Sequence, residues 1–211
     1  MKARVTRRVA LVQASLGLAA LAGCGASLLP PPPQAPSLYA LDDASTPPVA
    51  ARPASPGGPS ILVAPPRAAA GFDTRGIVYL RQPHAVEVYA YSQWVDTPAQ
   101  MLAPLIAHAL ERTGAFAVVL RAPTAANADL RLDTELLRLQ HDFSASPSRV
   151  RLTLRAVLVE QASRRALAWR EFDANVAAPT EDAYGGVRAA NQAVAALLAE
   201  MAAFVVQAAA R

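Results

Sequence analysis

The sequence predicts a single α+β domain in which an antiparallel sheet is packed by two helices and preceded by a proline-rich tether. The strongest observation is the alternation of apolar and polar side chains over residues 129–136 and 150–159, which is typical of half-buried strands. A second observation is that two segments, one after Thr97 and one after Thr180, place their apolar residues at helical spacing. Residues 61–211, about 150 in all, have the usual length of one domain.

The first element is predicted to be an export signal over residues 1–23. A basic head, Met1–Arg8, precedes the apolar stretch Val9–Ala22, in which Gln13 and Ser15 are the only polar side chains. This stretch has 14 residues, whereas a helix that crosses a hydrocarbon core of about 30 Å needs about 20. We therefore expect a signal that is cleaved rather than a permanent transmembrane anchor.

The tetrad Leu21-Ala22-Gly23-Cys24 at the end of this stretch resembles the lipobox of bacterial lipoproteins. Cys24 is the only cysteine of the chain, so an internal disulfide cannot form. The resemblance implies cleavage before Cys24 and covalent diacylglyceryl and N-acyl lipid on its thiol, and we expect no other cofactor. The alternative is an ordinary secretory signal that contains a cysteine by chance.

Gly25 follows the predicted lipidation site, where lipoproteins kept in the inner membrane usually carry aspartate. The residue therefore favours the outer membrane, with the protein facing the periplasm. Several acyl chains together can hold a protein firmly, since each buried methylene contributes about 0.8 kcal/mol.

The charge of the chain changes once the signal is removed. The full sequence holds 20 basic and 16 acidic residues, and four of the basic ones, Lys2, Arg4, Arg7 and Arg8, lie in the signal. The mature chain thus has 16 of each and a formal net charge of zero. Because nucleic-acid binding needs an excess of positive charge to neutralise phosphates, we exclude that class of partner.

Residues 24–60 are predicted to form the lipidated, proline-rich tether. The stretch Pro30–Pro59 holds ten of the 18 prolines and little that could build a core. One apolar island, Ser37–Leu41, has an aromatic residue and two leucines in alternation and predicts a short strand that docks on the domain. Alternatively, it is only a less polar part of a disordered linker.

The elements of the domain follow in order from residue 61. Short apolar runs predict strands near 61–63, 77–80, 85–91 and 116–120. The sequence Thr97-Pro98-Ala99-Gln100 predicts a helix start with a capping box, and Thr113-Gly114 predicts its end. Three strands near 129–136, 150–159 and 166–176 form a meander in which acids and arginines on neighbouring strands face each other. A helix of about 25 residues follows the cap Thr180-Glu181-Asp182 and packs across the sheet.

No pattern in the sequence predicts an enzyme or a metal site. The histidines His84, His108 and His141 lie far apart and without metal-ligand spacing. Neither a nucleophile elbow nor a phosphate-binding glycine loop is present. Tyr, Trp and Arg near the first strands instead suggest a protein interface, although Trp94 and two tyrosines could equally fill the core beneath the first helix. The candidate interface residues are Tyr39, Leu41, Tyr79, Arg81, Tyr89 and Trp94.

The order of these features resembles the ABC-type transport auxiliary lipoprotein family. The matching motifs are Tyr39-Ala40-Leu41, Ile61-Leu62-Val63-Ala64-Pro65, Gly76-Ile77-Val78-Tyr79-Leu80-Arg81 and Trp94. The resemblance implies a non-catalytic accessory component of an MCE/ABC-type or paraquat-inducible intermembrane phospholipid transport system. Its partners would be a periplasmic MCE-type protein, the inner-membrane transporter and further copies of itself. The resemblance assigns no lipid-contacting residue.

Two other functions stay open at this point. One is a structural or assembly lipoprotein of the outer membrane that is unrelated to transport. The other is a lipid-carrying protein, which would need a cavity large enough for an acyl chain. The sequence predicts instead a filled core around Trp94, Leu102 and Phe204.

Overall fold

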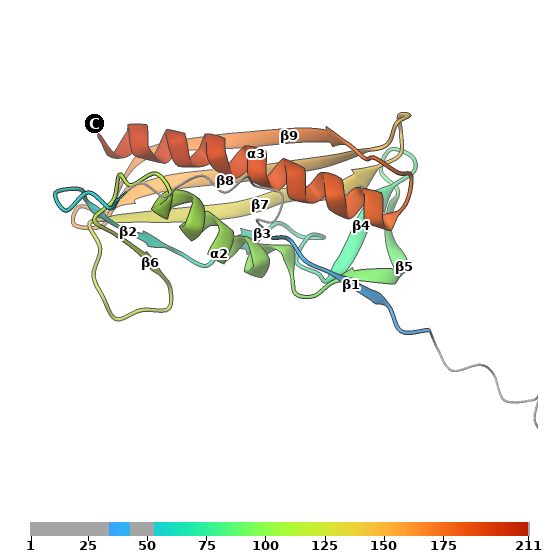
Figure 1. The fold of residues 1–211 in the computed structure, drawn as a ribbon, viewed down its shortest axis with the longest axis horizontal. Coiled ribbons are helices and arrows are strands. Elements are labelled where there is room, and N and C mark those ends of the chain that lie inside the picture. Colours follow the sequence, from blue (N-terminus) through green and yellow to red (C-terminus); the bar gives the residue numbers. More distant parts are fainter. Residues whose placement is uncertain (1–33, 43–52, 211) are drawn as a thin grey trace, which may run out of the picture. The chain divides into compact units, whose positions relative to one another are not determined.

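Two helices cover one face of a mixed sheet in this computed structural model, which describes residues 34–42 and 53–210 (Figure 1). The α+β class with two helices is therefore confirmed for the described residues. The predicted signal and Cys24 lie outside them. The elements in chain order are β1 (Ser37–Tyr39), β2 (Ser60–Val63), β3 (Arg67–Ala68), β4 (Gly76–Leu80), β5 (Val86–Trp94), α2 (Pro98–Glu111), β6 (Val118–Arg121), β7 (Leu130–Asp142), β8 (Arg149–Glu160), β9 (Arg165–Ala177) and α3 (Ala183–Ala209).

Strand β7 is the centre of the sheet and is paired along both of its edges. On one edge it pairs antiparallel with β8, which pairs antiparallel with β9, as predicted for the meander. Along the other edge β7 pairs in parallel with β2, then β3, then β4. The sheet is thus mixed and only partly antiparallel, because these three short strands reach β7 through long connections rather than tight hairpins.

The remaining strands extend the sheet at its two ends. Strand β5 pairs antiparallel with β4, and β1 adds to β5 in parallel. Strand β6 lies parallel to β2. The predicted strand in the island Ser37–Leu41 is therefore confirmed by its pairing with β5. It belongs to a compact unit that runs from Pro36 to Arg211.

Charged side chains of the meander face each other across its outer surface. Glu135, Arg155 and Glu171 lie in register on β7, β8 and β9. The Arg155 Nη2 lies 2.5 Å from Glu171 Oε1, and its Nη1 lies 3.7 Å from Glu135 Oε2. The three side chains are about a third or more exposed, so each pair stabilises the sheet by only tenths of a kcal/mol.

The two helices begin in different ways. Thr97 is the N-cap of α2 and Pro98 its first residue, but the Thr97 hydroxyl makes no capping hydrogen bond, so the predicted capping box is wrong. The Thr97 amide donates instead to Asp96 Oδ1 at 2.7 Å. At α3 the N-cap is Asp182, whose Oδ1 accepts from the Gly185 amide at 2.7 Å.

Helix α3 packs along the sheet, where it contacts β8 and β9. Among the described residues it is the one helix long and apolar enough to cross a membrane by length and composition. Its inner face carries Val187, Val194, Leu197, Met201 and Val205, all of which are buried. These contacts agree with the predicted packing of a long helix across the sheet.

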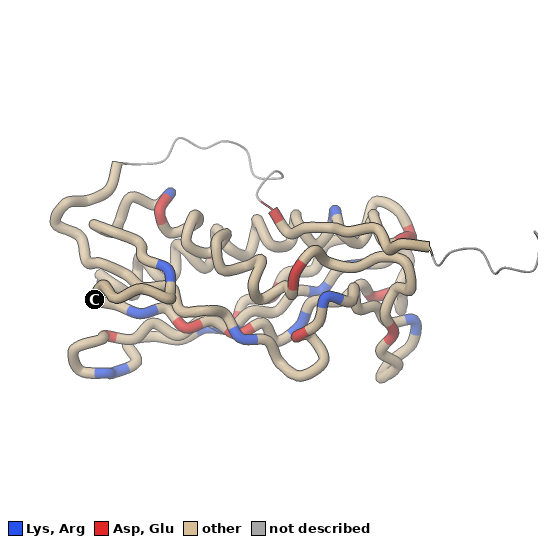
Figure 2. Tube along the Cα trace, turned by 90° about the horizontal axis from the view of Figure 1, so that it is seen from below, with Lys and Arg blue, Asp and Glu red and all other residues tan. Residues whose placement is uncertain are grey.

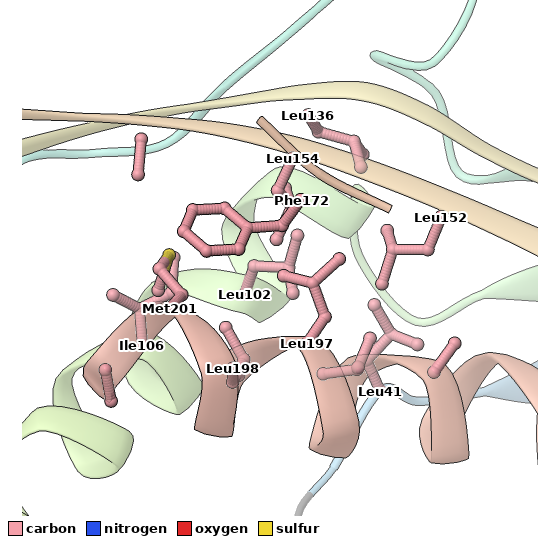
Figure 3. Packing of buried hydrophobic residues seen from close by; sticks show 14 of the residues in the cluster. Leu41, Leu102, Ile106, Leu136, Leu152, Leu154, Phe172, Leu197, Leu198 and Met201 are labelled. Carbon is pink, nitrogen blue, oxygen red and sulfur yellow. The ribbon is translucent and has the colours of Figure 1, made fainter. Parts of the chain in front are cut away.

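The core lies between the helices and the sheet (Figure 3). Phe172 of β9 packs its ring against Phe204 of α3 with centroids 5.6 Å apart. Trp94 and Leu102 are buried, and Phe204 is partly buried, so the predicted filling of the core at these residues is confirmed. Leu41 reaches the same core from the segment after β1.

Polar contacts hold the segment after β1 against both helices. The Leu41 amide approaches the Met101 sulfur of α2 at 3.4 Å. The Asp42 amide donates to Asn191 Oδ1 of α3 at 2.8 Å, and Asn191 Nδ2 donates to the Ala40 carbonyl at 3.1 Å. The N-terminal strand is thus fixed to α2, α3 and β5 together.

Candidate functional site

Three of the predicted interface residues, Tyr79, Arg81 and Tyr89, meet at the end of the sheet where β4, β5 and the start of α3 come together. They line a surface cavity of about 460 Å³ with Phe143 and Glu181. Tyr79 and Tyr89 come from neighbouring antiparallel strands, in which Tyr79 pairs with Glu87 and Tyr89 lies two residues further on. Alternation along β5 therefore directs both rings to the same face.

The aromatic rings are packed against each other. The Tyr79 and Tyr89 centroids lie 4.5 Å apart, and the Phe143 ring meets Tyr79 edge-on at 6.0 Å. The Arg81 guanidinium carbon lies 5.5 Å from the Tyr79 ring centroid, within the range of a cation–π contact. The Tyr79 hydroxyl donates to Glu87 Oε2 at 2.7 Å. The surface thus presents aromatic faces, one cation and two carboxylates.

A buried hydrogen-bond network supports this surface from below. The Tyr89 hydroxyl lies 3.0 Å from His141 Nδ1, and His141 Nε2 lies 2.8 Å from the Ser148 Oγ. The Ser148 amide in turn donates to Glu181 Oε1 at 2.8 Å. His141 and Ser148 are 2% and 0% exposed. The hydroxyl of Ser148 is therefore out of reach of any substrate in solution, and the network holds the aromatic surface in place.

Burial sets the protonation of this network. It lowers the pKa of His141, which is neutral as a result, although Glu181, Asp182 and Asp142 oppose the shift. Burial is also the main cause that raises the pKa of Tyr89. The hydrogen bonds from Ser148 lower the pKa of Glu181, which therefore stays ionised at the cavity.

Helix α3 approaches the network at a glycine. A Cβ atom built on Gly186 would lie 2.5 Å from His141 Nδ1, which is closer than real Cβ contacts. Only glycine at this position lets the first turn of α3 rest on the imidazole without displacing it.

The domain is expected to lose stability as the pH falls below 6.5. In the unfolded chain His141 takes up a proton near its usual pKa of 6.5, whereas burial keeps the folded imidazole neutral to lower pH. The free energy of unfolding should therefore decrease as the pH falls below 6.5. Urea unfolding at several pH values measures this dependence.

The His141→Gln variant should show a flatter pH dependence below pH 6.5. His108→Gln is the matched control, since the His108 side chain is half exposed, and it should keep the wild-type dependence. An equal pH dependence in wild type and His141→Gln would contradict the assignment.

The other predicted interface residues lie elsewhere. Leu41 and Trp94 are 5% and 3% exposed, which places them in the core rather than on a contact surface. The Trp94 carbonyl accepts from Arg75 Nε at 3.2 Å. Tyr39 is partly buried, and its ring lies 6.3 Å from that of Tyr184 at the start of α3.

Within the described ranges, no three His, Cys, Asp or Glu side chains form a group that could hold a metal ion. The site therefore consists of an aromatic and charged surface over a hydrogen-bond network in which His141 and Ser148 are buried. Such a surface has the chemistry of a protein contact, in which Tyr and Arg are favoured anchors.

Comparison with known families decides the identity of the chain. The family described as the ABC-type transport auxiliary lipoprotein component matches residues 39–202. The chain belongs to this family. An auxiliary lipoprotein is anchored to a membrane of the cell envelope and is associated with a transport system. No curated protein matches the sequence.

Solved structures share the fold of this auxiliary lipoprotein. One is a Xanthomonas campestris protein of the DUF330 family, with a TM-score of 0.69 and 23% identity over 82% of this chain and 95% of the other. A second, of an uncharacterized protein, has a TM-score of 0.63 and 15% identity over 82% and 99% of the two chains. At these identities the likeness concerns the fold alone.

Sequence reasoning missed the other residues of the site of this auxiliary lipoprotein, namely Glu87, His141, Phe143, Ser148 and Glu181. The predicted strand ended near residue 136, whereas β7 runs on to Asp142 and includes His141. Strand β7 changes register between Leu136 and Arg138, and this shift breaks the alternation before it reaches His141. Phe143 and Glu181 join the site only through the pairing of β4 with β7 and the packing of α3.

Proposed function

We propose that this chain is a non-catalytic accessory component of an MCE/ABC-type intermembrane phospholipid transport system. Lipid on Cys24 holds it to the periplasmic side of the outer membrane, where it acts as a homo-oligomer beside a periplasmic MCE-type protein. The observation that carries this proposal is the family match over residues 39–202. Gly25 supports the outer membrane as the location.

The surface at Tyr79, Arg81 and Tyr89 is the part of the domain that this proposal assigns to the partner. Its rings are already fixed by the network beneath them, so little side-chain freedom is lost on binding. Arg81 adds a cation at its edge, where it can meet an acidic group of the partner.

Arg81→Glu is expected to weaken the capture of the MCE-type partner from native membrane extracts by about tenfold or more, since a like charge opposes the same acidic group. The measurement is quantitative mass spectrometry after affinity purification of the full-length lipoprotein. Arg121→Glu on β6, which is also exposed, is the matched control and should leave capture unchanged.

Failure to recover any MCE-type protein or transporter with the wild-type lipoprotein would overturn the proposed function. Recovery of an outer-membrane assembly factor in their place would support the structural or assembly role. Equal loss of capture in the Arg81 and Arg121 variants would overturn only the choice of surface.

A further inference from the structure

A groove of about 550 Å³ runs between α2 and α3. Its size lies within the range of about 300–1,000 Å³ that is usual for small-molecule sites. Aliphatic side chains of both helices line it, namely Leu105 and Ala109 of α2 and Val194, Leu198, Ala202 and Val206 of α3. Trp94 and Leu102, which are buried in the core, do not line it.

The groove is long enough for an extended hydrocarbon chain. Its lining on α3 runs from Val194 to Gln207, which at 1.5 Å per residue corresponds to about 20 Å. Ala195, Ala199 and Ala203 along this side are too small to fill the space between the helices. The shape is therefore that of a channel for one linear apolar chain.

The two ends of the groove differ in charge. The Leu41–Asp42 segment contacts Met101 in the first turn of α2 and Asn191 in the N-terminal half of α3. The helices run from there in the same direction (Figure 1). Asp42 therefore lines one end of the groove, whereas Arg112, Thr113 and Gln207 line the other.

Arg112 gives the second end the chemistry of a phosphate site. It is the one arginine or lysine among the described lining residues, and a guanidinium binds phosphate oxygens in a two-pronged geometry. The Gln207 amide adds a hydrogen-bond donor at this end. An amphiphile with an apolar tail and an anionic head matches the groove from end to end.

The surroundings of the groove are poor in charge. Figure 2 shows that acidic and basic residues gather along the sheet, while few lie along the helices. Over its 27 residues, α3 carries only Arg188 and Glu200 as charged side chains. Little solvated charge therefore opposes the entry of an apolar chain from this side.

We propose that the α2–α3 groove binds one acyl chain of a phospholipid, with the lipid phosphate at Arg112. The shape and polarity of the groove define an acyl amphiphile, and the choice of a phospholipid rests on the proposed function. The chain would thus hold lipid itself, in addition to docking on its partner.

Photo-crosslinking in cells tests this proposal on the full-length lipoprotein. The crosslinking residue p-benzoylphenylalanine replaces Ala199, which lines the groove, or Ala196, which is exposed on the same helix outside the lining. Cells are labelled with ³²P-phosphate, and the adduct is identified by mass. We expect a phospholipid adduct at position 199 and at most a tenth of that yield at position 196. The Arg112→Gln variant should lower the yield at position 199 about tenfold, because it removes a hydrogen bond to a charged group.

Equal adducts at both positions would overturn the proposal, because they would report only the nearness of a membrane. The absence of labelled adduct at position 199, with the thermal melting of the variant unchanged, would also overturn it. An adduct without phosphorus would identify the acyl chains of the protein's own anchor as the occupant and overturn the phospholipid assignment. Loss of MCE-type partners with adducts retained would overturn the proposed function alone.

Discussion

Replacing Cys24 by serine is expected to abolish lipid attachment and to remove the protein from the membrane fraction. A serine hydroxyl does not accept the diacylglyceryl group that the cysteine thiol takes, so no acyl chain joins the mature chain. A single acyl chain gives only marginal membrane binding, and firm attachment depends on several chains acting together. Mass spectrometry of the N-terminus and membrane fractionation measure the two effects.

Gly25→Asp is the matched control for this experiment. It should keep the acylated mass of the N-terminus but move the protein to the inner membrane, since aspartate after the cysteine is the retention signal of the lipoproteins that the lipobox resembles. If Cys24→Ser leaves both the N-terminal mass and the fractionation unchanged, residues 1–23 are an ordinary secretory signal.

Phe172→Ala is expected to lower the free energy of unfolding by about 3–5 kcal/mol. The Phe172 side chain is 1% exposed, lies opposite Leu154 in the sheet and packs on Phe204 of α3. Its removal leaves a cavity between β9 and the long helix, where neither neighbour can close the gap without bending. Urea unfolding monitored by circular dichroism measures the loss.

Phe204→Ala removes the other ring of the same pair and serves as the control. Phe204 is only partly buried, so its loss should cost less than that of Phe172. A cost below about 1 kcal/mol for Phe172→Ala, the size of a surface substitution, would contradict the packing described for the core.

The elements predicted best from the sequence are those whose pattern is local. Alternation predicted the strands near 129–136 and 150–159, which correspond to β7 and β8. The helical spacing after Thr180 likewise placed α3, because an apolar stripe at this period buries only as a helix. The predicted capping box at Thr97 is wrong, because the Asp96 carboxylate, not Gln100, accepts from the Thr97 amide and the Thr97 hydroxyl makes no capping hydrogen bond.

Features that depend on pairing between distant segments could not be predicted in this way. Strands β2, β3 and β4 pair in parallel with β7, but the apolar and polar pattern of a single strand does not indicate its pairing partner. The same holds for the site. Tyr79, Arg81 and Tyr89 are close in sequence and were grouped in advance, whereas His141 reaches them only because β4 pairs beside it. The groove between α2 and α3 depends on the spacing of the two helices, and this spacing cannot be predicted from the sequence of either helix alone.

The pairing of β7 also sets the order in which the chain can acquire structure. The Ser60 amide at the start of β2 donates to the Asp129 carboxylate just before β7, 69 residues further on. Strands β3 and β4 pair with β7 as well. Contacts over such separations close slowly because the intervening chain must first be brought together. A polypeptide that crosses a membrane with its N-terminus first would therefore have to deliver the meander before its early strands could settle. Until β7 is available, the strands of the leading half lack the partner with which they pair.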